Sequence, residues 1–289
     1  MKVGFVSIFG KPNAGKSTLL NALLGQKLAI VSPKVQTTRH RIKGIYSTPE
    51  AQIIFSDTPG IIQPQYKLHE RMMGAVKSAL EDADLAILLL DIHEDWLEAD
   101  ALFQSLKLKV PALIVINKTE TASTKTVGEA AHFFLSKLYA KKLVLISALK
   151  QSGMEQLLQE IIQLLPDGEP YYDADELTDL SERFFVAEII REKMYALFEQ
   201  EIPYQSTVVV NEFKQKTGLI KIGASVIVQR ESQKNIIIGS GGKSIKQLGT
   251  LARTDIEKFI GQKVFLELFV KVRPRWRDND LLLREYGYQ

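Results

Sequence analysis

Short apolar runs alternate with amphipathic stretches through the first part of the chain. The runs, nearly continuous in apolar residues, lie at 3–9, 51–55, 85–90, 112–116 and 143–146. Such runs are typical of strands that are buried on both faces of a parallel sheet. Stretches with helical spacing separate most of them, at 16–24, 68–81, 98–106, 126–138 and 154–164. This order predicts a doubly wound α/β domain, in which ligands bind beyond the carboxyl ends of the strands.

The last part of the chain has a different pattern. Apolar residues recur at helical spacing at Val186, Ile190, Met194 and Leu197. Alternate residues are then apolar over 220–228 and 264–272, which predicts strands with one buried and one exposed face. The run 236–238 resembles a further short strand, placed directly before a glycine-rich loop. We therefore expect a small α+β domain with one half-exposed sheet.

Residues 166–180 separate the two patterns. They contain six acidic residues, no basic residue, two prolines and a glycine, which is typical of an exposed linker. The predicted organisation is a nucleotide-binding domain over 1–165, an acidic linker over 166–180 and a second domain over 181–289.

Composition narrows the class of protein. The 289 residues include 37 Lys and Arg against 34 Asp and Glu, 45% hydrophobic residues and no cysteine. Two domains suit this length, and the average composition excludes a disordered chain. The absence of cysteine excludes disulfides, thiolate metal sites and a cysteine nucleophile. Because the apolar runs are much shorter than the ~20 residues of a membrane span, and the chain starts with a strand, we expect a soluble cytoplasmic protein.

The segment from Gly10 to Ser17 fits the phosphate-loop pattern G-x-x-x-x-G-K-[ST], after a predicted strand and before a predicted helix. Glycines allow the backbone amides to turn toward phosphate oxygens, and the helix N-terminus favours an anion. Lys16 is expected to bridge the outer phosphates, and the Ser17 hydroxyl is expected to bind Mg²⁺. The motif predicts a nucleoside triphosphate site without identifying the base.

Three further motifs follow predicted strands in order. Asp57-Thr58-Pro59-Gly60 offers a carboxylate for a magnesium-bound water and a glycine amide for the γ-phosphate. Asn117, Lys118 and Glu120 offer an amide, a stem to cover the base and a carboxylate for the guanine N–H groups. The turn Ser147-Ala148-Leu149 offers an amide for the guanine carbonyl. Together they indicate a GTPase, which binds GTP and GDP.

These motifs, with the segment 33–39 (PKVQTTR), resemble those of the Era family of bacterial GTPases along essentially the whole chain. The resemblance implies a nucleotide site made of Gly10, Lys11, Pro12, Asn13, Ala14, Gly15, Lys16, Ser17, Thr18, Thr37, Thr38, Asp57, Gly60, Asn117, Lys118, Glu120, Ser147, Ala148 and Leu149. One residue departs from the family pattern. Glu120 stands where the family usually has aspartate, and its carboxylate lies one methylene further out.

The residue after Asp57-Thr58-Pro59-Gly60 bears on hydrolysis. Ras-type GTPases orient the attacking water with a glutamine there, whereas this chain has Ile61. A nucleotide switch without useful hydrolysis is one interpretation. The resemblance implies another, in which a K⁺ ion near Asn13 supplies positive charge between the phosphates. We expect slow hydrolysis, catalytic roles for Asn13, Lys16, Thr38 and Gly60, and Mg²⁺ held by Ser17, Asp57 and either Thr37 or, preferred, Thr38.

The second domain contains a glycine loop, Gly239-Ser240-Gly241-Gly242, in a basic stretch. Residues 243–277 hold nine basic and three acidic residues. The loop, the helix expected after it and the alternating strands resemble a bacterial-type KH domain, in which the glycines let an RNA backbone approach. The expected RNA-binding residues are Ile238, Gly239, Ser240, Gly241, Gly242, Lys243, Ile245, Lys246, Arg275 and Trp276, where Trp276 either stacks on RNA or caps the last strand.

The resemblance implies single-stranded rRNA at the 3′ end of the small-subunit rRNA as the partner and a role in assembly of the small ribosomal subunit. We also expect a monomer. Two alternatives remain. A tRNA-modification GTPase shares the phosphate-loop style but often uses a C-terminal cysteine, which this chain lacks. A signalling GTPase could use the basic face on anionic lipid, peripheral to the inner face of the cell membrane.

Overall fold

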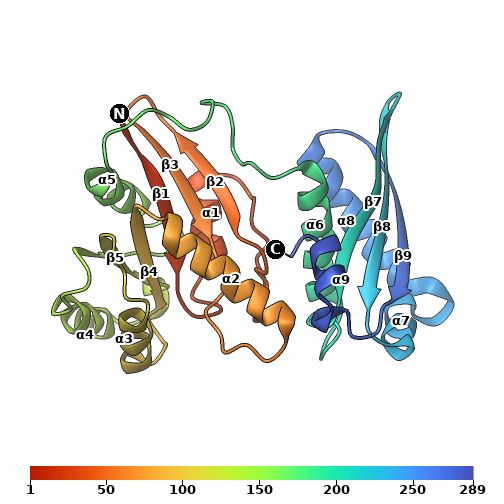
Figure 1. The fold of residues 1–289 in the computed structure, drawn as a ribbon, viewed down its shortest axis with the longest axis horizontal. Coiled ribbons are helices and arrows are strands. Elements are labelled where there is room, and N and C mark those ends of the chain that lie inside the picture. Colours follow the sequence, from red (N-terminus) through yellow and green to blue (C-terminus); the bar gives the residue numbers. More distant parts are fainter. Residues whose placement is uncertain (289) are drawn as a thin grey trace. The chain divides into compact units, whose positions relative to one another are not determined.

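The computed structural model describes residues 1–288, which divide into two compact units (Figure 1). Unit 1 comprises Met1–Gln63 and Met72–Asp179, and unit 2 comprises Pro64–Arg71 and Leu180–Gln289. Among the described residues, no helix is both long enough and apolar enough to cross a membrane.

Unit 1 contains a six-stranded, mostly parallel sheet in the order β2-β3-β1-β4-β5-β6. The strands are β1 (Lys2–Phe9), β2 (Ile42–Ser47), β3 (Ala51–Asp57), β4 (Leu85–Asp91), β5 (Ala112–Asn117) and β6 (Lys142–Leu145). The predicted doubly wound sheet is confirmed. The sequence pattern missed β2, an edge strand that pairs antiparallel to β3, because its apolar residues are interrupted by Lys43 and Gly44.

Helices cover both faces of this sheet. They are α1 (Lys16–Leu24), α2 (Lys67–Asp82), α3 (Trp96–Ser105), α4 (Thr124–Leu135) and α5 (Met154–Leu164). A core cluster joins Val76 of α2, Phe103 of α3 and Phe134 of α4 to one face of the sheet, while α1 and α5 contact each other and other strands. The expected helix over 126–138 ends at Leu135 instead, where Ser136 forms the C-cap.

The acidic segment 166–179 belongs to unit 1 and follows its sheet. The amide of Val3 donates to the carbonyl of Pro166 (3.0 Å), and the amide of Ile45 donates to that of Leu177 (2.8 Å). Between these points, the buried Gln52 side chain accepts from the amides of Tyr171 (2.7 Å) and Tyr172 (3.0 Å) and donates to the Tyr172 carbonyl (2.8 Å). The segment is exposed but fixed at several points along its length.

Unit 2 contains the three-stranded sheet β7-β8-β9. Its strands are β7 (Thr207–Lys216), β8 (Leu219–Val228) and β9 (Val264–Val272), and its helices are α6 (Glu182–Leu197), α7 (Glu231–Ile238), α8 (Lys243–Ile260) and α9 (Asp280–Glu285). Apolar residues of α6 and α8 pack on one face of the sheet, which confirms a small α+β domain. Within this unit, Asp280 pairs with Lys67 and with Arg71 (3.0 Å).

The prediction of a strand-like run at 236–238 is wrong. These residues form the last turn of α7, in which Ile237 is buried and Ile236 is half exposed. The Gln233 side chain accepts from the amides of Gln229 and Arg230 and thereby satisfies donors at the helix start. Three consecutive isoleucines have no periodicity of their own, so the apolar pattern alone does not distinguish a strand from the end of a helix.

Candidate functional site

The phosphate loop connects β1 to α1 and closes around Lys16. Gly15 has φ of +100°, and a Cβ atom there would lie 2.3 Å from the Asn117 side-chain nitrogen, so only glycine suits this position. The Lys16 ammonium donates to the carbonyls of Gly10 (3.2 Å) and Lys11 (2.9 Å). Burial lowers the pKa of Lys16 to about 8, against the attraction of Asp57. A phosphate group in this loop would restore a full counter-charge to the lysine.

A cluster of hydroxyl and carboxylate oxygens lies beside this lysine. The Ser17 hydroxyl donates to Asp57 Oδ2 (2.7 Å), Thr38 Oγ1 donates to the same oxygen (3.2 Å), and the two hydroxyls are 2.8 Å apart. Asp57 is fully buried, which raises the pKa of its carboxyl group, and its Oδ1 has no hydrogen-bond partner among the described residues. Hard oxygen ligands with one carboxylate fit Mg²⁺, which keeps several waters and binds substrate phosphates.

This cluster shows which of the two threonines, Thr37 or Thr38, is placed to bind Mg²⁺, a choice that the sequence left open. Thr38 points to Ser17 and Asp57, whereas the Thr37 hydroxyl donates to the carbonyl of Lys34 (2.7 Å). The geometry therefore favours Thr38 as the hydroxyl that would complete a magnesium shell.

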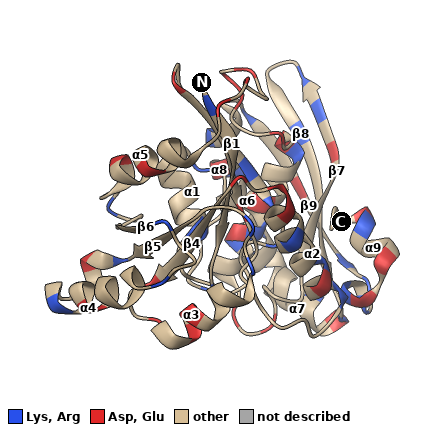
Figure 2. Ribbon diagram, turned by 60° about the vertical axis from the view of Figure 1, so that its left-hand side comes forward, with Lys and Arg blue, Asp and Glu red and all other residues tan. Residues whose placement is uncertain are grey.

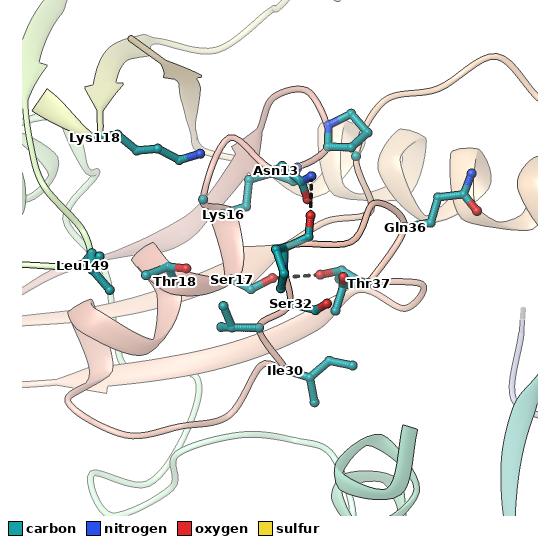
Figure 3. A pocket seen from close by; sticks show the side chains of 16 residues that line it. Asn13, Lys16, Ser17, Thr18, Ile30, Ser32, Gln36, Thr37, Lys118 and Leu149 are labelled. Carbon is teal, nitrogen blue, oxygen red and sulfur yellow. Dashed lines mark hydrogen bonds between the residues drawn. The ribbon is translucent and has the colours of Figure 1, made fainter. Parts of the chain in front are cut away.

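A cavity of about 450 Å³ opens above the loop (Figure 3). It brings together predicted residues from the four motifs and from the segment 33–39: Pro12, Asn13, Gly15, Lys16, Ser17, Thr18, Thr37, Thr38, Gly60, Lys118 and Leu149. Five further residues line the cavity that were not among the predicted site residues: Ile30, Val31, Ser32, Pro33 and Gln36. All five lie in a segment without regular structure. No periodicity or motif marks Ile30, Val31 and Ser32, whereas Pro33 and Gln36 lie in the segment 33–39 that carries the family resemblance. The remaining predicted nucleotide residues do not line the cavity: Gly10, Lys11, Ala14, Asp57, Asn117, Glu120, Ser147 and Ala148.

Asn117 connects the motifs behind the cavity. Its side-chain nitrogen donates to the carbonyl of Ala14 (2.9 Å), and its Oδ1 accepts from the amide of Ala148 (3.0 Å). In the turn Ser147-Ala148-Leu149, from which an amide is predicted to reach the guanine carbonyl, the Ala148 amide is thus engaged by Asn117. Asn117 is buried, whereas Glu120 is exposed in a short 3₁₀ turn.

The catalytic candidates Asn13 and Gly60 both line the cavity. The Asn13 side chain donates to the carbonyl of Pro33 (3.0 Å). A Cβ atom on Gly60 would lie 2.8 Å from Pro12, so the absence of a side chain allows the two loops to meet. Ile61 packs against the apolar core and offers no polar group to a water molecule.

The glycine loop of unit 2 lies between α7 and α8. Gly239 is confined, since a Cβ atom there would be 2.2 Å from the Ser244 hydroxyl. In contrast, Gly241 and Gly242 both have positive φ and open space where a Cβ atom would be. The loop therefore offers a bare, outward-facing backbone before the start of α8, which an RNA backbone can approach.

A groove between α8 and β9 lies next to this loop. It is lined by Ile245, Lys246, Gly249, Thr250, Arg253, Phe265, Leu266 and Leu268. Lys243, Lys246 and Arg253 are exposed and form no ion pair with a described residue. On the strands, by contrast, Lys221 pairs with Glu212 (3.0 Å) and Glu267 (3.2 Å), and acidic and basic positions lie together (Figure 2). The groove combines apolar walls for bases with unpaired positive charge for phosphates.

The prediction that Trp276 stacks on RNA is wrong. Trp276 has no exposed surface, its indole N–H donates to the carbonyl of Gln205 (3.1 Å), and its ring stacks with that of Tyr288. Its other interpretation, as a cap beyond the last strand, agrees with this packing. Arg275 is exposed and remains a predicted RNA contact.

Family models match both units. The model described as a 50S ribosome-binding GTPase matches residues 5–118, and the KH domain model matches residues 201–277.

Proteins named GTPase Era match the whole chain. The one from Geobacter sp. (strain M21) is 44% identical and that from Geotalea uraniireducens 42% identical, each over 99% of this chain and 97% of the relative. A crystal structure of a single-residue variant of Aquifex aeolicus Era bound to GDP and AlF4⁻ is 41% identical, with a TM-score of 0.96 over 100% of this chain and 99% of that one. The crystal structure of Era in complex with MgGDPNP and nucleotides 1506–1542 of 16S ribosomal RNA is also 41% identical. Its TM-score is 0.96 over 100% of this chain and 99% of that one.

Proposed function

Because this chain belongs to the Era family of GTPases, we propose that it is a GTP-controlled factor that binds the 3′ end of the small-subunit rRNA and assists assembly of that subunit. The chain is a GTPase that uses a guanine nucleotide and Mg²⁺. The rRNA target, the assembly role and slow turnover are the parts that we propose.

The residues of the phosphate site supply binding and charge. Loop amides and Lys16 bind the phosphates, while Ser17, Thr38 and Asp57 would hold Mg²⁺, which neutralises charge on the transferred phosphoryl group. The Gly60 amide is expected to donate to the γ-phosphate. Because Ile61 cannot orient water through a hydrogen bond, we expect slow intrinsic hydrolysis.

A K⁺ ion is proposed to supply the missing positive charge. The Asn13 side chain lines the cavity and presents an amide oxygen while its nitrogen donates to Pro33. A cation bound by that oxygen and by phosphate oxygens would act where an arginine finger acts in other GTPases.

The observation that carries the RNA proposal is the basic groove beside the bare glycine loop. A relative that shares this fold along the whole chain, at 41% identity, binds a 16S rRNA fragment. Apolar groove walls suit splayed bases of single-stranded RNA, whereas an anionic membrane needs only surface charge. We therefore assign this basic face to RNA and not to lipid.

Gly242→Asp tests this assignment. The change places a carboxylate beside the RNA backbone, and aspartate tolerates the positive φ of this position. Like-charge contact in an interface costs several kcal/mol, so binding of a single-stranded 3′-end rRNA oligonucleotide should be lost in an electrophoretic shift assay. Basal GTP hydrolysis should be unchanged.

Gly261→Asp is the matched control. Gly261 also has positive φ and open space around a Cβ atom, but it ends α8, the helix that Gly242 begins. Its substitution should leave RNA binding intact. Unchanged RNA affinity in a folded Gly242→Asp variant would overturn the KH interpretation, and flotation of the wild type with anionic liposomes would then favour the lipid alternative.

A further inference from the structure

The loop after β4 contacts the loop that reads the base. Asp91 ends β4 and lies opposite Asn117 in the register of the sheet. The amide of Ile92 donates to the carbonyl of Asn117 (3.1 Å), so the two loops stay joined just beyond the last paired residues. None of the four GTPase motifs includes this loop.

Asp91 also holds the lysine of the base-reading motif. The Lys118 ammonium lies 2.6 Å from Asp91 Oδ2, while Asp91 Oδ1 accepts from the amide of His93 (3.0 Å). The amide of Asp91 in turn donates to Glu94 Oε1 (3.0 Å). Both carboxylate oxygens of Asp91 are therefore engaged, and its orientation is fixed by its own loop.

Lys118 needs such support because its backbone is in an unfavourable conformation. Its φ of +63° lies in the left-handed region, which residues other than glycine, asparagine and aspartate rarely adopt. The Thr121 hydroxyl donates to the carbonyl of Lys118 (2.7 Å). His93 Nε2 lies 2.7 Å from the same hydroxyl, which gives a third tie between the two loops.

The restrained side chain lines the nucleotide cavity. Figure 3 shows Lys118 extending across the cavity at the end where Leu149 also lies, away from Gln36 and Thr37. A planar base entering there would meet the lysine stem on one face and Leu149 on the other. An ammonium held by Asp91 keeps that stem extended before the nucleotide arrives, which reduces the conformational entropy lost on binding.

We propose that Asp91 is a positioning residue for guanine-nucleotide binding, acting through its ion pair with Lys118. This inference rests on the proposed base site, of which it names a supporting residue. Glu120 increases the need for it, because the longer carboxylate side chain has one more rotatable bond than the usual aspartate and fixes a base less rigidly.

Asp91→Asn is the first test. The affinity of the full chain for GDP, measured by calorimetry with Mg²⁺, should fall about fivefold, the size expected for a partly buried ion pair. The KM for GTP should rise by a similar factor while kcat stays unchanged, because the phosphates bind at the other end of the cavity. Affinity for Mg²⁺-tripolyphosphate, which has no base, should be unchanged. Asp91→Glu should restore most of the GDP affinity.

Lys118→Met provides a double-mutant cycle. This variant keeps an apolar stem but loses the ammonium, so it should weaken GDP binding as much as Asp91→Asn, and the double variant should be no weaker than either. Asp95→Asn is the matched control on the same loop. Asp95 caps α3 through the Glu98 amide, and asparagine caps a helix about as well as aspartate, so its substitution should leave both thermal stability and GDP affinity nearly unchanged.

Different outcomes test the positioning role of Asp91 and the base site itself. Equal GDP affinity in wild type and Asp91→Asn, or fully additive effects in the double variant, would overturn the positioning role. Unchanged GDP affinity in Lys118→Ala, which removes the stem, would overturn the base site itself. A parallel loss of tripolyphosphate affinity in Asp91→Asn would assign Asp91 a general structural role and refute the proposal.

Discussion

At the residue scale, the nucleotide site contains two buried charged side chains from different motifs, Lys16 and Asp57. Each is only partly compensated by the protein: Lys16 donates to two carbonyls, and Asp57 has one oxygen without a partner among the described residues. Burial shifts both pKa values toward the neutral forms. Bound phosphate would stabilise the Lys16 ammonium, and bound Mg²⁺ would stabilise the Asp57 carboxylate, so both pKa shifts would reverse. The free energy cost of burying these two charges is therefore lower in the nucleotide-bound state.

Lys16→Ala should nearly abolish nucleotide binding. Charge-assisted hydrogen bonds contribute about 1.5–3 kcal/mol each, so the loss of Lys16 should weaken GTP affinity about 100-fold or more in calorimetry. Lys77→Ala, on an exposed helix position, is the control and should bind normally. An unchanged affinity in Lys16→Ala would refute the assignment of the phosphate site.

Nucleotide binding should take up a proton above pH 8. The pKa of Lys16 is about 8 in the nucleotide-free protein because burial disfavours the ammonium. Bound phosphates favour the ammonium and raise this pKa, so at about pH 8.5, chosen near that value, the deprotonated fraction must be protonated on binding. Calorimetry in buffers of different ionisation enthalpy measures this uptake, and GTP affinity should decline further as the pH rises. Absence of proton uptake would contradict the coupling.

Hydrolysis should be faster in K⁺ than in Na⁺. Asn13→Gly removes the amide that we assign to K⁺, and glycine adopts the φ of +65° at this position without strain. The rate difference between the two salts should disappear in this variant, as measured by phosphate release. Equal wild-type rates in both salts would exclude the potassium proposal while leaving GTP binding unaffected.

The residues that the sequence could predict are those whose chemistry is fixed by a motif. Gly15, Lys16, Ser17 and Asp57 come together because each follows a strand or begins a helix at one edge of the sheet. Asp91 was missed because its role depends on sheet register and not on a motif. Trp276 was misassigned because basic neighbours in the sequence say nothing of its burial.

At the element scale, the sheet order and helices of unit 1 follow from apolar periodicity, whereas edges and connections do not. Strand β2 is short and interrupted, and its place is fixed by pairing with β3. The acidic segment 166–179 has the composition of a linker, yet Gln52 and β2 bind it through side-chain and backbone hydrogen bonds. Such long-range contacts leave no periodic signal in the sequence.

Gln52→Ala should destabilise unit 1. The substitution leaves the amides of Tyr171 and Tyr172 without partners and opens a small cavity, at a cost of about 1–3 kcal/mol. Hydrogen exchange at the amides of Tyr171, Tyr172 and Ile45, which donates to the Leu177 carbonyl, should become faster. Gln262→Ala, which removes an exposed side-chain hydrogen bond with Gln215, is the control and should change neither quantity. Unchanged exchange in Gln52→Ala would show that Gln52 does not hold the segment.

At the scale of the whole molecule, nucleotide binding and RNA binding are assigned to two units with separate hydrophobic cores. Unit 1 holds the nucleotide cavity, and unit 2 holds the basic groove. The sequence predicted two domains, but the division by contacts assigns 166–179 to unit 1 and Pro64–Arg71 to unit 2. The latter assignment includes the pairs of Lys67 and Arg71 with Asp280, more than 200 residues later in the chain, which no local pattern could indicate.

RNA affinity measured in the two nucleotide states decides whether GTP controls RNA binding by this chain. Fluorescence anisotropy of a labelled 3′-end rRNA oligonucleotide, titrated with the full chain, should give about tenfold tighter binding with a non-hydrolysable GTP analogue than with GDP, a coupling of ~1.4 kcal/mol. Asp57→Asn, which removes the magnesium carboxylate, should abolish the difference. Equal RNA affinity in the GTP and GDP states of the wild type would contradict a GTP-controlled RNA-binding factor.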